Sequence, residues 1–221
     1  MTSNEMLTSR KRWTPHGRRD RHGALERIVP LRRTERKLAT VLFVDVYGSM
    51  DLSAAMELEA WWLMLSELFE LMCEGVHRFG GWIANFTGDG IKGVFEGPDG
   101  AEVHARQACQ AALWLRHALR APSSALLHER GLELRVRIGI NSGEVLMGTI
   151  GGRYGRCYIA SGYAVALAKR IESLARPGRV YVTEHTAALV ADALKLQDLG
   201  AFDVKGAPAP VSVFELVETA G

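Results

Sequence analysis

The chain has 221 residues, of which 48% are hydrophobic and 24% are charged, and its formal net charge is +2. This length fits one domain, and the composition excludes a wholly disordered or collagen-like chain. No apolar run approaches the roughly 20 residues needed to span a bilayer, so we expect a cytoplasmic protein without membrane contact. The three cysteines are widely spaced and indicate reduced thiols rather than a disulfide framework or a zinc site.

The charge is unevenly distributed along the chain. Residues 1–37 carry 11 Lys and Arg against 4 Asp and Glu, a net of +7, whereas residues 38–221 carry a net of −5. We therefore expect residues 1–37 to form a basic, flexible N-terminal arm and residues 38–221 to form one folded domain. The arm has a single aromatic residue, Trp13, and no recognition motif, so the sequence does not favour nucleic acid as a partner.

The first half of the domain alternates strands with one long helix. Residues 38–46 are a β-branched apolar run that predicts a buried strand. Apolar residues at helical spacing predict a helix over 54–79, which ends at a pair of glycines. Two short apolar runs, 82–86 and 91–95, are joined by Thr87-Gly88-Asp89-Gly90, and Asp-Gly between such runs is typical of a β-hairpin.

The second half continues with a long helix and further short elements. The predicted elements are a helix over 99–119, strands over 132–140 and 144–150, a helix over 162–174, a strand over 179–183, a helix over 184–191 and a final pair of strands around 196–204 and 211–216. The core order is therefore β-α-β-β-α-β. We expect an α+β fold of the ferredoxin-like split βαβ type, a sandwich with helices on one face of an antiparallel sheet, with a C-terminal α/β extension.

Two acidic residues lie where the fold alone does not call for them. Asp45 ends an apolar strand, and Asp89 lies at the tip of the hairpin that should adjoin this strand. A carboxylate at a buried strand end is costly unless it is paired or binds a metal. Two carboxylates with substrate phosphates suit Mg²⁺ or Mn²⁺, and successive amides in the turn Val46–Met50 suit a phosphate. Asp89 alone is also explained by an ordinary turn, so these residues by themselves name no reaction.

Several segments, in the right order, resemble the catalytic domain of class III nucleotide cyclases. The matching segments are Val44-Asp45-Val46-Tyr47-Gly48-Ser49, Thr87-Gly88-Asp89-Gly90, Arg137 to Val145, Gly162 to Glu172, and Phe202-Asp203-Val204-Lys205-Gly206. The resemblance covers residues 38–217 and identifies residues 38–221 as a cyclase catalytic domain. Such a domain converts a nucleoside triphosphate into a 3′,5′-cyclic nucleotide and pyrophosphate.

The resemblance implies a role for each matching residue. Asp45 and Asp89 match the two aspartates that hold two Mg²⁺ or Mn²⁺ ions, with the Val46 carbonyl as a further ligand. Tyr47, Gly48 and Ser49 match the turn that binds the triphosphate. Arg170 matches the arginine that stabilises the transition state, and Lys205 matches the lysine that holds the terminal phosphate.

The resemblance also implies a homodimer whose active sites are shared across the interface. One protomer supplies Asp45 and Asp89, and the other supplies Asn85, Ile159 and Arg170. A separate effector protein that binds the cyclic nucleotide is expected as well.

The positions that read a purine base depart from the adenylate cyclase pattern. Asn85 replaces a lysine, Ile159 replaces Asp or Thr, and Ala166 replaces the asparagine that orients the ribose. Loss of the base-reading set with retention of the metal and phosphate set indicates a different base, because an amide at position 85 offers both a donor and an acceptor. Tyr47, Tyr158 and Tyr163 provide rings to stack on that base. The pattern resembles the bacterial pyrimidine cyclases of antiphage defence, which make cyclic UMP or cyclic CMP.

Two other interpretations stay open. One is an adenylate cyclase with an atypical base pocket. The other is a catalytically inactive cyclase-like domain that serves in dimerisation or signalling, which the alanine at position 166 favours.

Overall fold

The computed structural model describes residues 34–152 and 155–217. The expected arm therefore lies outside the described residues, apart from its last four positions. These four positions belong to the first strand, which begins at Thr34 rather than at residue 38. The helices are α1 (Ser49–Ala54), α2 (Leu58–Arg78), α3 (Ala101–Ala118), α4 (Arg120–Arg130), α5 (Tyr163–Leu174) and α6 (Glu184–Val190). The strands are β1 (Thr34–Val46), β2 (Trp82–Phe86), β3 (Gly90–Phe95), β4 (Val136–Gly152), β5 (Gly155–Ser161), β6 (Val180–Thr183), β7 (Lys195–Phe202) and β8 (Val211–Val217).

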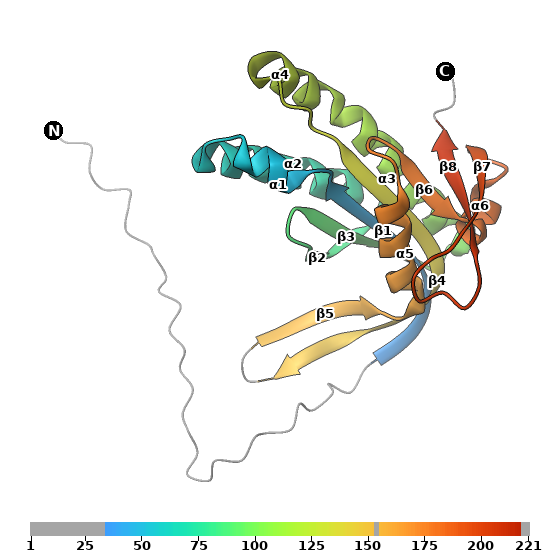
Figure 1. Cartoon of the computed structure of the whole chain (residues 1–221). Coiled ribbons are helices and arrows are strands. Elements are labelled where there is room, and N and C mark those ends of the chain that lie inside the picture. The colour runs from blue at the N-terminus through green and yellow to red at the C-terminus, as the bar shows by residue number, and fades with distance from the viewer. Residues whose placement is uncertain (1–33, 153–154, 218–221) are drawn as a thin grey trace, which may run out of the picture.

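All of these strands belong to one sheet. The order is β2-β3-β1-β4-β6-β8-β7, and β5 pairs with β4 away from this path (Figure 1). The described pairs are antiparallel except for β4 and β6. The central order β2-β3-β1-β4 is that of the predicted split βαβ core, and β6 to β8 with α6 form the C-terminal extension. The predicted fold class is confirmed.

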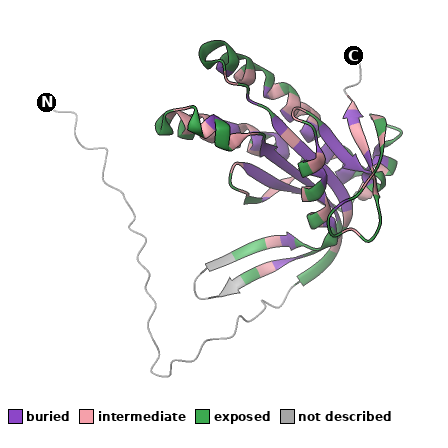
Figure 2. Ribbon diagram, in the orientation of Figure 1, coloured by how far each residue is buried: buried purple, intermediate pink, exposed green. Residues whose placement is uncertain are grey.

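Helices cover both faces of the sheet, so the prediction of helices on one face is wrong, because β1 is apolar on both sides and α5 packs on the second face. On one face, α2, α3 and α6 cover Leu42 and Val44 of β1. These side chains alternate along the strand with those that point to the other face. On the opposite face, α5 packs on β1 and β4, where Val41 and Phe43 belong to a second apolar cluster. Figure 2 shows that β1, β3 and β6 are largely buried, whereas α4 is largely exposed.

The helix predicted over 54–79 corresponds to α2, and the short helix α1 precedes it. Gly48 adopts a left-handed conformation with φ of 68°, which starts a helical turn at Ser49. Glu57 is extended, with φ of −63° and ψ of 144°, so the helix restarts at Leu58. The apolar spacing therefore located α2 correctly but did not reveal the short helix before it.

The two strands predicted over 132–150 are a single long strand, β4. Asn141, Ser142 and Gly143 have the composition of a turn, yet each pairs with β1 in an unbroken ladder. The strand tolerates Asn141 because its buried amide donates to the Ala164 carbonyl and accepts from the Thr183 hydroxyl. The second half of β4 forms a ribbon with β5, a strand absent from the prediction.

Two expectations from composition can be compared with the described residues. Within residues 34–152 and 155–217, no helix combines the length and hydropathy needed to cross a membrane. Cys73, Cys109 and Cys157 are all free thiols, as predicted.

Candidate functional site

Asp45 and Asp89 lie at the same edge of the sheet, as the sequence predicts. Asp45 is directly opposite Gly90 in the antiparallel pairing of β1 with β3, and Asp89 precedes Gly90 in the hairpin. This approach requires glycine, because a Cβ at position 90 would lie 2.2 Å from the Val44 carbonyl oxygen and 3.0 Å from Asp45 Oδ1. The missing side chain at Gly90 therefore lets the start of β3, with Asp89 immediately before it, pack closely against Asp45.

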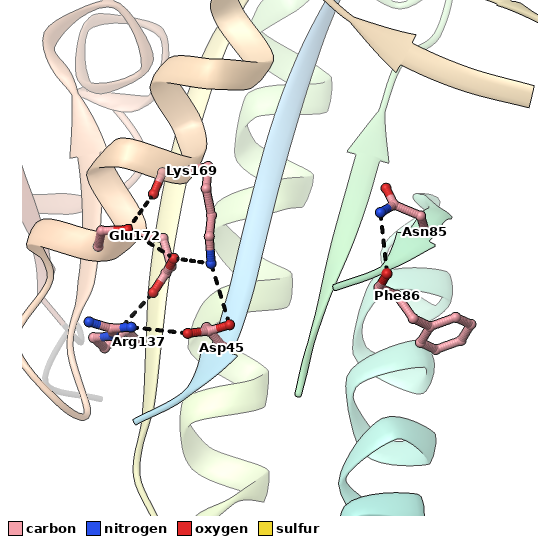
Figure 3. A network of polar contacts seen from close by, with 7 residues as sticks. Asp45, Asn85, Phe86, Arg137, Lys169 and Glu172 are labelled. Atoms are coloured by element: carbon pink, nitrogen blue, oxygen red, sulfur yellow. Dashed lines mark hydrogen bonds and ion pairs between the residues drawn. The ribbon is translucent and has the colours of Figure 1, made fainter. Parts of the chain in front are cut away.

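Asp45 is held by two cationic side chains. Arg137 lies opposite Asp45 on β4, and its Nη2 is 3.0 Å from Asp45 Oδ2. Lys169 on α5 places its Nζ 3.3 Å from Asp45 Oδ1. Figure 3 shows both cations approaching the carboxylate from the side of β4 and α5. The strand-end carboxylate is therefore buried with partners, which removes most of the cost that the sequence suggested.

Glu172 on α5 completes this network by pairing with the same two cations. Its side chain is fully buried and forms ion pairs with Lys169 at 2.6 Å and with Arg137 at 3.1 Å. Burial raises the pKa of the Glu172 carboxyl group, although hydrogen bonding to Lys169 opposes the rise. Gly139 allows α5 this close to β4, because a Cβ there would lie 2.0 Å from the Glu172 amide nitrogen. The network therefore ties β1, β4 and α5 together at the end of the sheet.

The turn Tyr47-Gly48-Ser49 follows Asp45 and leads into α1. The Tyr47 amide donates to the Arg135 carbonyl at 2.8 Å, so the amides that can meet a phosphate are those of Gly48 and Ser49. The Tyr47 ring is 49% exposed and lies 5.6 Å from the Arg137 guanidinium. Val46 is almost fully buried beside Asp45 in the sheet. The predicted phosphate turn is thus adjacent to the carboxylate pair.

Arg170 and Lys205 line a separate small pocket of about 210 Å³, shared with Tyr163 and Ala166. This pocket lies between α5 and the turn before β8. Lys169 faces Asp45, whereas the next residue, Arg170, faces this second pocket. The structure therefore brings Arg170 and Lys205 together but directs them away from Asp45 of the same chain.

The predicted base-reading positions lie on neighbouring strands apart from both clusters. Asn85 is exposed on β2, and its Nδ2 donates to the Phe86 carbonyl at 3.3 Å (Figure 3). Ile159 is half-buried on β5, opposite Gly148. The ring of Trp82 on β2 lies 5.4 Å from that of Tyr158 on β5, so the two strands touch.

The donor chemistry at Asp45 and Asp89 fits divalent cations. Two carboxylates and a neighbouring backbone carbonyl are hard oxygen ligands of the kind that Mg²⁺ and Mn²⁺ prefer. Within the part of the chain that the structure describes, no group of three or more His, Cys, Asp and Glu side chains is placed to hold an ion. Ions held by only two carboxylates would take their remaining ligands from substrate phosphates and water.

Sequence reasoning missed the partners of Asp45. Arg137 was visible as a charged residue in an apolar strand, and Lys169 and Glu172 as an i, i+3 pair in a helix. Their convergence on Asp45 depends on the register of β1 with β4 and on the close packing of α5, and neither can be read from spacing alone.

Comparison with known proteins identifies the fold and the family. Residues 32–218 match the model of the family described as adenylate and guanylate cyclase catalytic domain. Adenylate cyclase 1 of Rhizobium meliloti is 30% identical over 184 residues, which are 82% of this chain and 28% of that protein. The receptor-type guanylate cyclase gcy-23 of Caenorhabditis elegans is 28% identical over 151 residues, 66% of this chain and 14% of that protein. The chain thus spans less than a third of the length of these two relatives.

Solved structures of cyclases superpose on most of the chain. The adenylyl cyclase CyaB from P. aeruginosa has a TM-score of 0.82 at 29% identity, covering 85% of this chain and 97% of that one. The guanylyl cyclase Cya2 has a TM-score of 0.76 at 28% identity, covering 82% and 92%. With the family match across residues 32–218 and the paired aspartates at the sheet edge, the chain belongs to the class III adenylate and guanylate cyclase catalytic domain family.

Proposed function

We propose that this chain is a nucleotide cyclase that converts a pyrimidine nucleoside triphosphate, UTP or CTP, into the 3′,5′-cyclic monophosphate and pyrophosphate. The observation that carries the proposal is the contrast between two parts of the site. Asp45 lies opposite Gly90, with Asp89 next to it in the chain at the same end of the strands, and Arg170 shares a pocket with Lys205. The residues that read a purine in adenylate cyclases are replaced in this chain by Asn85, Ile159 and Ala166.

In this reaction Asp45 and Asp89 hold the divalent ions and the Gly48 and Ser49 amides receive the triphosphate. When bound, two Mg²⁺ or Mn²⁺ ions neutralise phosphate charge and favour ionisation of the ribose 3′-hydroxyl. Gly48 supports the turn because its φ of 68° directs successive amides toward one side. The chain's contribution is therefore the positioning of the triphosphate for an in-line displacement, in which the 3′-oxygen bonds to the α-phosphorus and pyrophosphate leaves.

Arg170 and Lys205 act on the phosphates from the other side. The planar guanidinium of Arg170 donates to oxygens that gain charge as the α-phosphorus is attacked. Lys205 pairs with the terminal phosphate. Both side chains are exposed and line one pocket, so they are accessible to a polyanionic substrate.

A complete site needs two protomers. Lys169 on α5 contacts Asp45, whereas the adjacent Arg170 lines the separate pocket with Lys205, so the two clusters lie on different sides of α5. In a two-fold dimer, Asp45 and Asp89 of one protomer would face Asn85, Ile159 and Arg170 of its partner. An isolated monomer should therefore be inactive.

The base pocket supports a pyrimidine through its polarity and its rings. The Asn85 amide has a donor and an acceptor for the edge of uracil or cytosine. Tyr47, Tyr158 and Tyr163 are each at least 44% exposed and present rings for stacking.

A product assay tests the proposal directly. Purified protein is incubated with Mn²⁺ and with ATP, GTP, CTP or UTP separately, and the cyclic products are identified by mass spectrometry. We expect cyclic UMP or cyclic CMP as the main product, and we expect Asp45→Asn to abolish it. Asp192→Asn, at an exposed position in the turn after α6, is the matched control and should retain activity. Cyclic AMP as the main product would contradict the pyrimidine preference.

Adenylate cyclase activity is the second candidate, because both Rhizobium adenylate cyclase 1 and CyaB carry that name. The same assay separates the two activities. A domain with no cyclic product from any nucleotide would fit the third candidate, an inactive module for dimerisation or signalling, which the alanine at position 166 favours.

The biological role that we propose is production of a second messenger in antiphage defence, read by a separate effector that binds the cyclic nucleotide. Expression of the chain with its neighbouring genes should reduce phage plaque counts. Asp45→Asn in the same cells should restore them, and equal protection by this variant would contradict the proposed role.

A further inference from the structure

Lys92 is a buried lysine in a strand that is otherwise apolar. It lies at the centre of β3, whose residues are all buried, and it is only 9% exposed. Its Nζ donates one hydrogen bond, to the Ala160 carbonyl on β5 at 3.3 Å. Among the described residues Lys92 forms no ion pair.

One carbonyl does not satisfy this amine. A lysine has three N–H donors when charged, and burial away from a carboxylate disfavours the charged form. Desolvation accordingly lowers the pKa of Lys92, with a weaker opposing effect from Cys157. Methionine would fill the same space without this cost, so the amine indicates a ligand that accepts its remaining hydrogen bonds.

Lys92 lies between the two strands that carry the base-reading positions. In the pairing of β2 with β3 it is directly opposite Asn85, and such partners have Cβ atoms about 4.5–5.5 Å apart on the same face. Its hydrogen-bond acceptor, Ala160, is the neighbour of Ile159 on β5. A base that contacts Asn85 and the backbone of β5 therefore comes within reach of the Lys92 amine.

We propose that Lys92 is a base-binding residue that donates a hydrogen bond to a ring carbonyl or ring nitrogen of the substrate base. The Ala160 carbonyl beside it accepts an N–H from the same edge. This donor and acceptor pair fits the O4 and N3–H groups of uracil or the N3 and N4–H groups of cytosine. The O6 and N1–H groups of guanine and the N1 and N6–H groups of adenine present the same pattern, so the pair holds a base edge and does not by itself select a pyrimidine. The inference rests on the proposed function, since it assigns the base contact of that site.

Binding of nucleotides that cannot react tests the inference apart from turnover. The four 3′-deoxynucleoside triphosphates lack the attacking hydroxyl group, and pyrophosphate lacks a base. Each is titrated by calorimetry with Mn²⁺ into the wild-type protein, Lys92→Met and Lys195→Met. Methionine conserves volume at the buried position, and Lys195 is an exposed lysine on β7.

We expect Lys92→Met to bind the nucleotide that the wild-type protein binds most tightly at least about tenfold more weakly, because the hydrogen bond from the buried amine to the base is lost. Lys92→Met should bind pyrophosphate unchanged, and Lys195→Met should match the wild type for every ligand. The inference is overturned if Lys92→Met binds that nucleotide as tightly as the wild type does, or if it weakens pyrophosphate as much as the nucleotides. Base-dependent binding that Lys92→Met weakens, without cyclic product from true substrates, would instead contradict the proposed function.

Discussion

At the scale of single residues, Asp45 is surrounded by cations of the protein itself. Arg137 and Lys169 occupy its two carboxylate oxygens at 3.0 and 3.3 Å. An incoming divalent ion therefore competes with the Lys169 ammonium for the Asp45 carboxylate. Glu172 offers that ammonium an alternative partner at 2.6 Å. The position of Asp45 was predictable from its place at the end of an apolar strand. Its partners were not, because they depend on strand register.

This competition makes a prediction for Lys169→Met. Removing a partly exposed charge that competes for Asp45 should tighten Mn²⁺ binding by about threefold to tenfold, equivalent to roughly 1 kcal/mol. The measurement is a calorimetric Mn²⁺ titration with 3′-deoxy-UTP or 3′-deoxy-CTP present. Lys195→Met serves as the control and should leave the affinity unchanged. Weaker Mn²⁺ binding by Lys169→Met would mean that Lys169 supports the metal site rather than competing for it.

At the scale of elements, the strands of the core were predictable and the helix boundaries less so. β1, β2 and β3 were found because apolar runs and an Asp-Gly turn are local signals. The division between α1 and α2 depends on one extended residue, Glu57, within a pattern that remains helical. The prediction split β4 into two strands because Asn141 and Gly143 mimic a turn, whereas tertiary contacts satisfy the Asn141 amide within an unbroken strand.

The packing of α5 on β4 makes a prediction for Gly139→Ala. The added Cβ would meet the backbone of Glu172, its amide nitrogen at 2.0 Å and its Cα at 2.4 Å, so the helix must move. We expect a loss of about 1–3 kcal/mol in the free energy of unfolding, measured by denaturant titration. Gly97→Ala is the matched control, because a Cβ there meets nothing within 4 Å. Equal stability of the two variants would contradict the close packing of α5.

At the scale of the whole molecule, a buried polar network joins strands and helices across the sheet. His104 on α3 shares a hydrogen bond of 2.8 Å with Thr40 on β1, and Thr40 bonds to Ser142 on β4. The Ser142 hydroxyl in turn accepts from Thr186 on α6. Desolvation lowers the pKa of His104, with an opposing effect from Glu96.

The lowered pKa of His104 predicts acid-sensitive stability. An unfolded histidine binds its proton near pH 6.5, whereas folded His104 binds it only at lower pH, so the unfolded state takes up more protons between these values. The free energy of unfolding should therefore fall as pH drops below about 6.5, by at most about 1.4 kcal/mol per pH unit for this one proton. Denaturant titrations between pH 7.5 and 5 measure the slope. His104→Gln should flatten it and the exposed His128→Gln should not; identical slopes would contradict the assignment.

The central claim at this scale is that two half-sites on one chain combine with their counterparts in a dimer. The sequence predicted the members of each half-site. It did not predict that Lys169 and Arg170, which are adjacent on α5, would face different half-sites. Spacing alone cannot show this, because both residues lie near the middle of a helix that contacts the sheet and the C-terminal extension.

The most direct measurement is complementation between two inactive variants. Asp45→Asn and Arg170→Ala are co-expressed with different tags, and the mixed dimer is isolated by two affinity steps. Each variant alone should make no detectable cyclic nucleotide. The mixed dimer has one site with both substitutions and one with neither, so it should recover about half of the wild-type turnover. A mixed dimer as inactive as its parents, beside an active wild-type protein, would contradict a site shared between protomers.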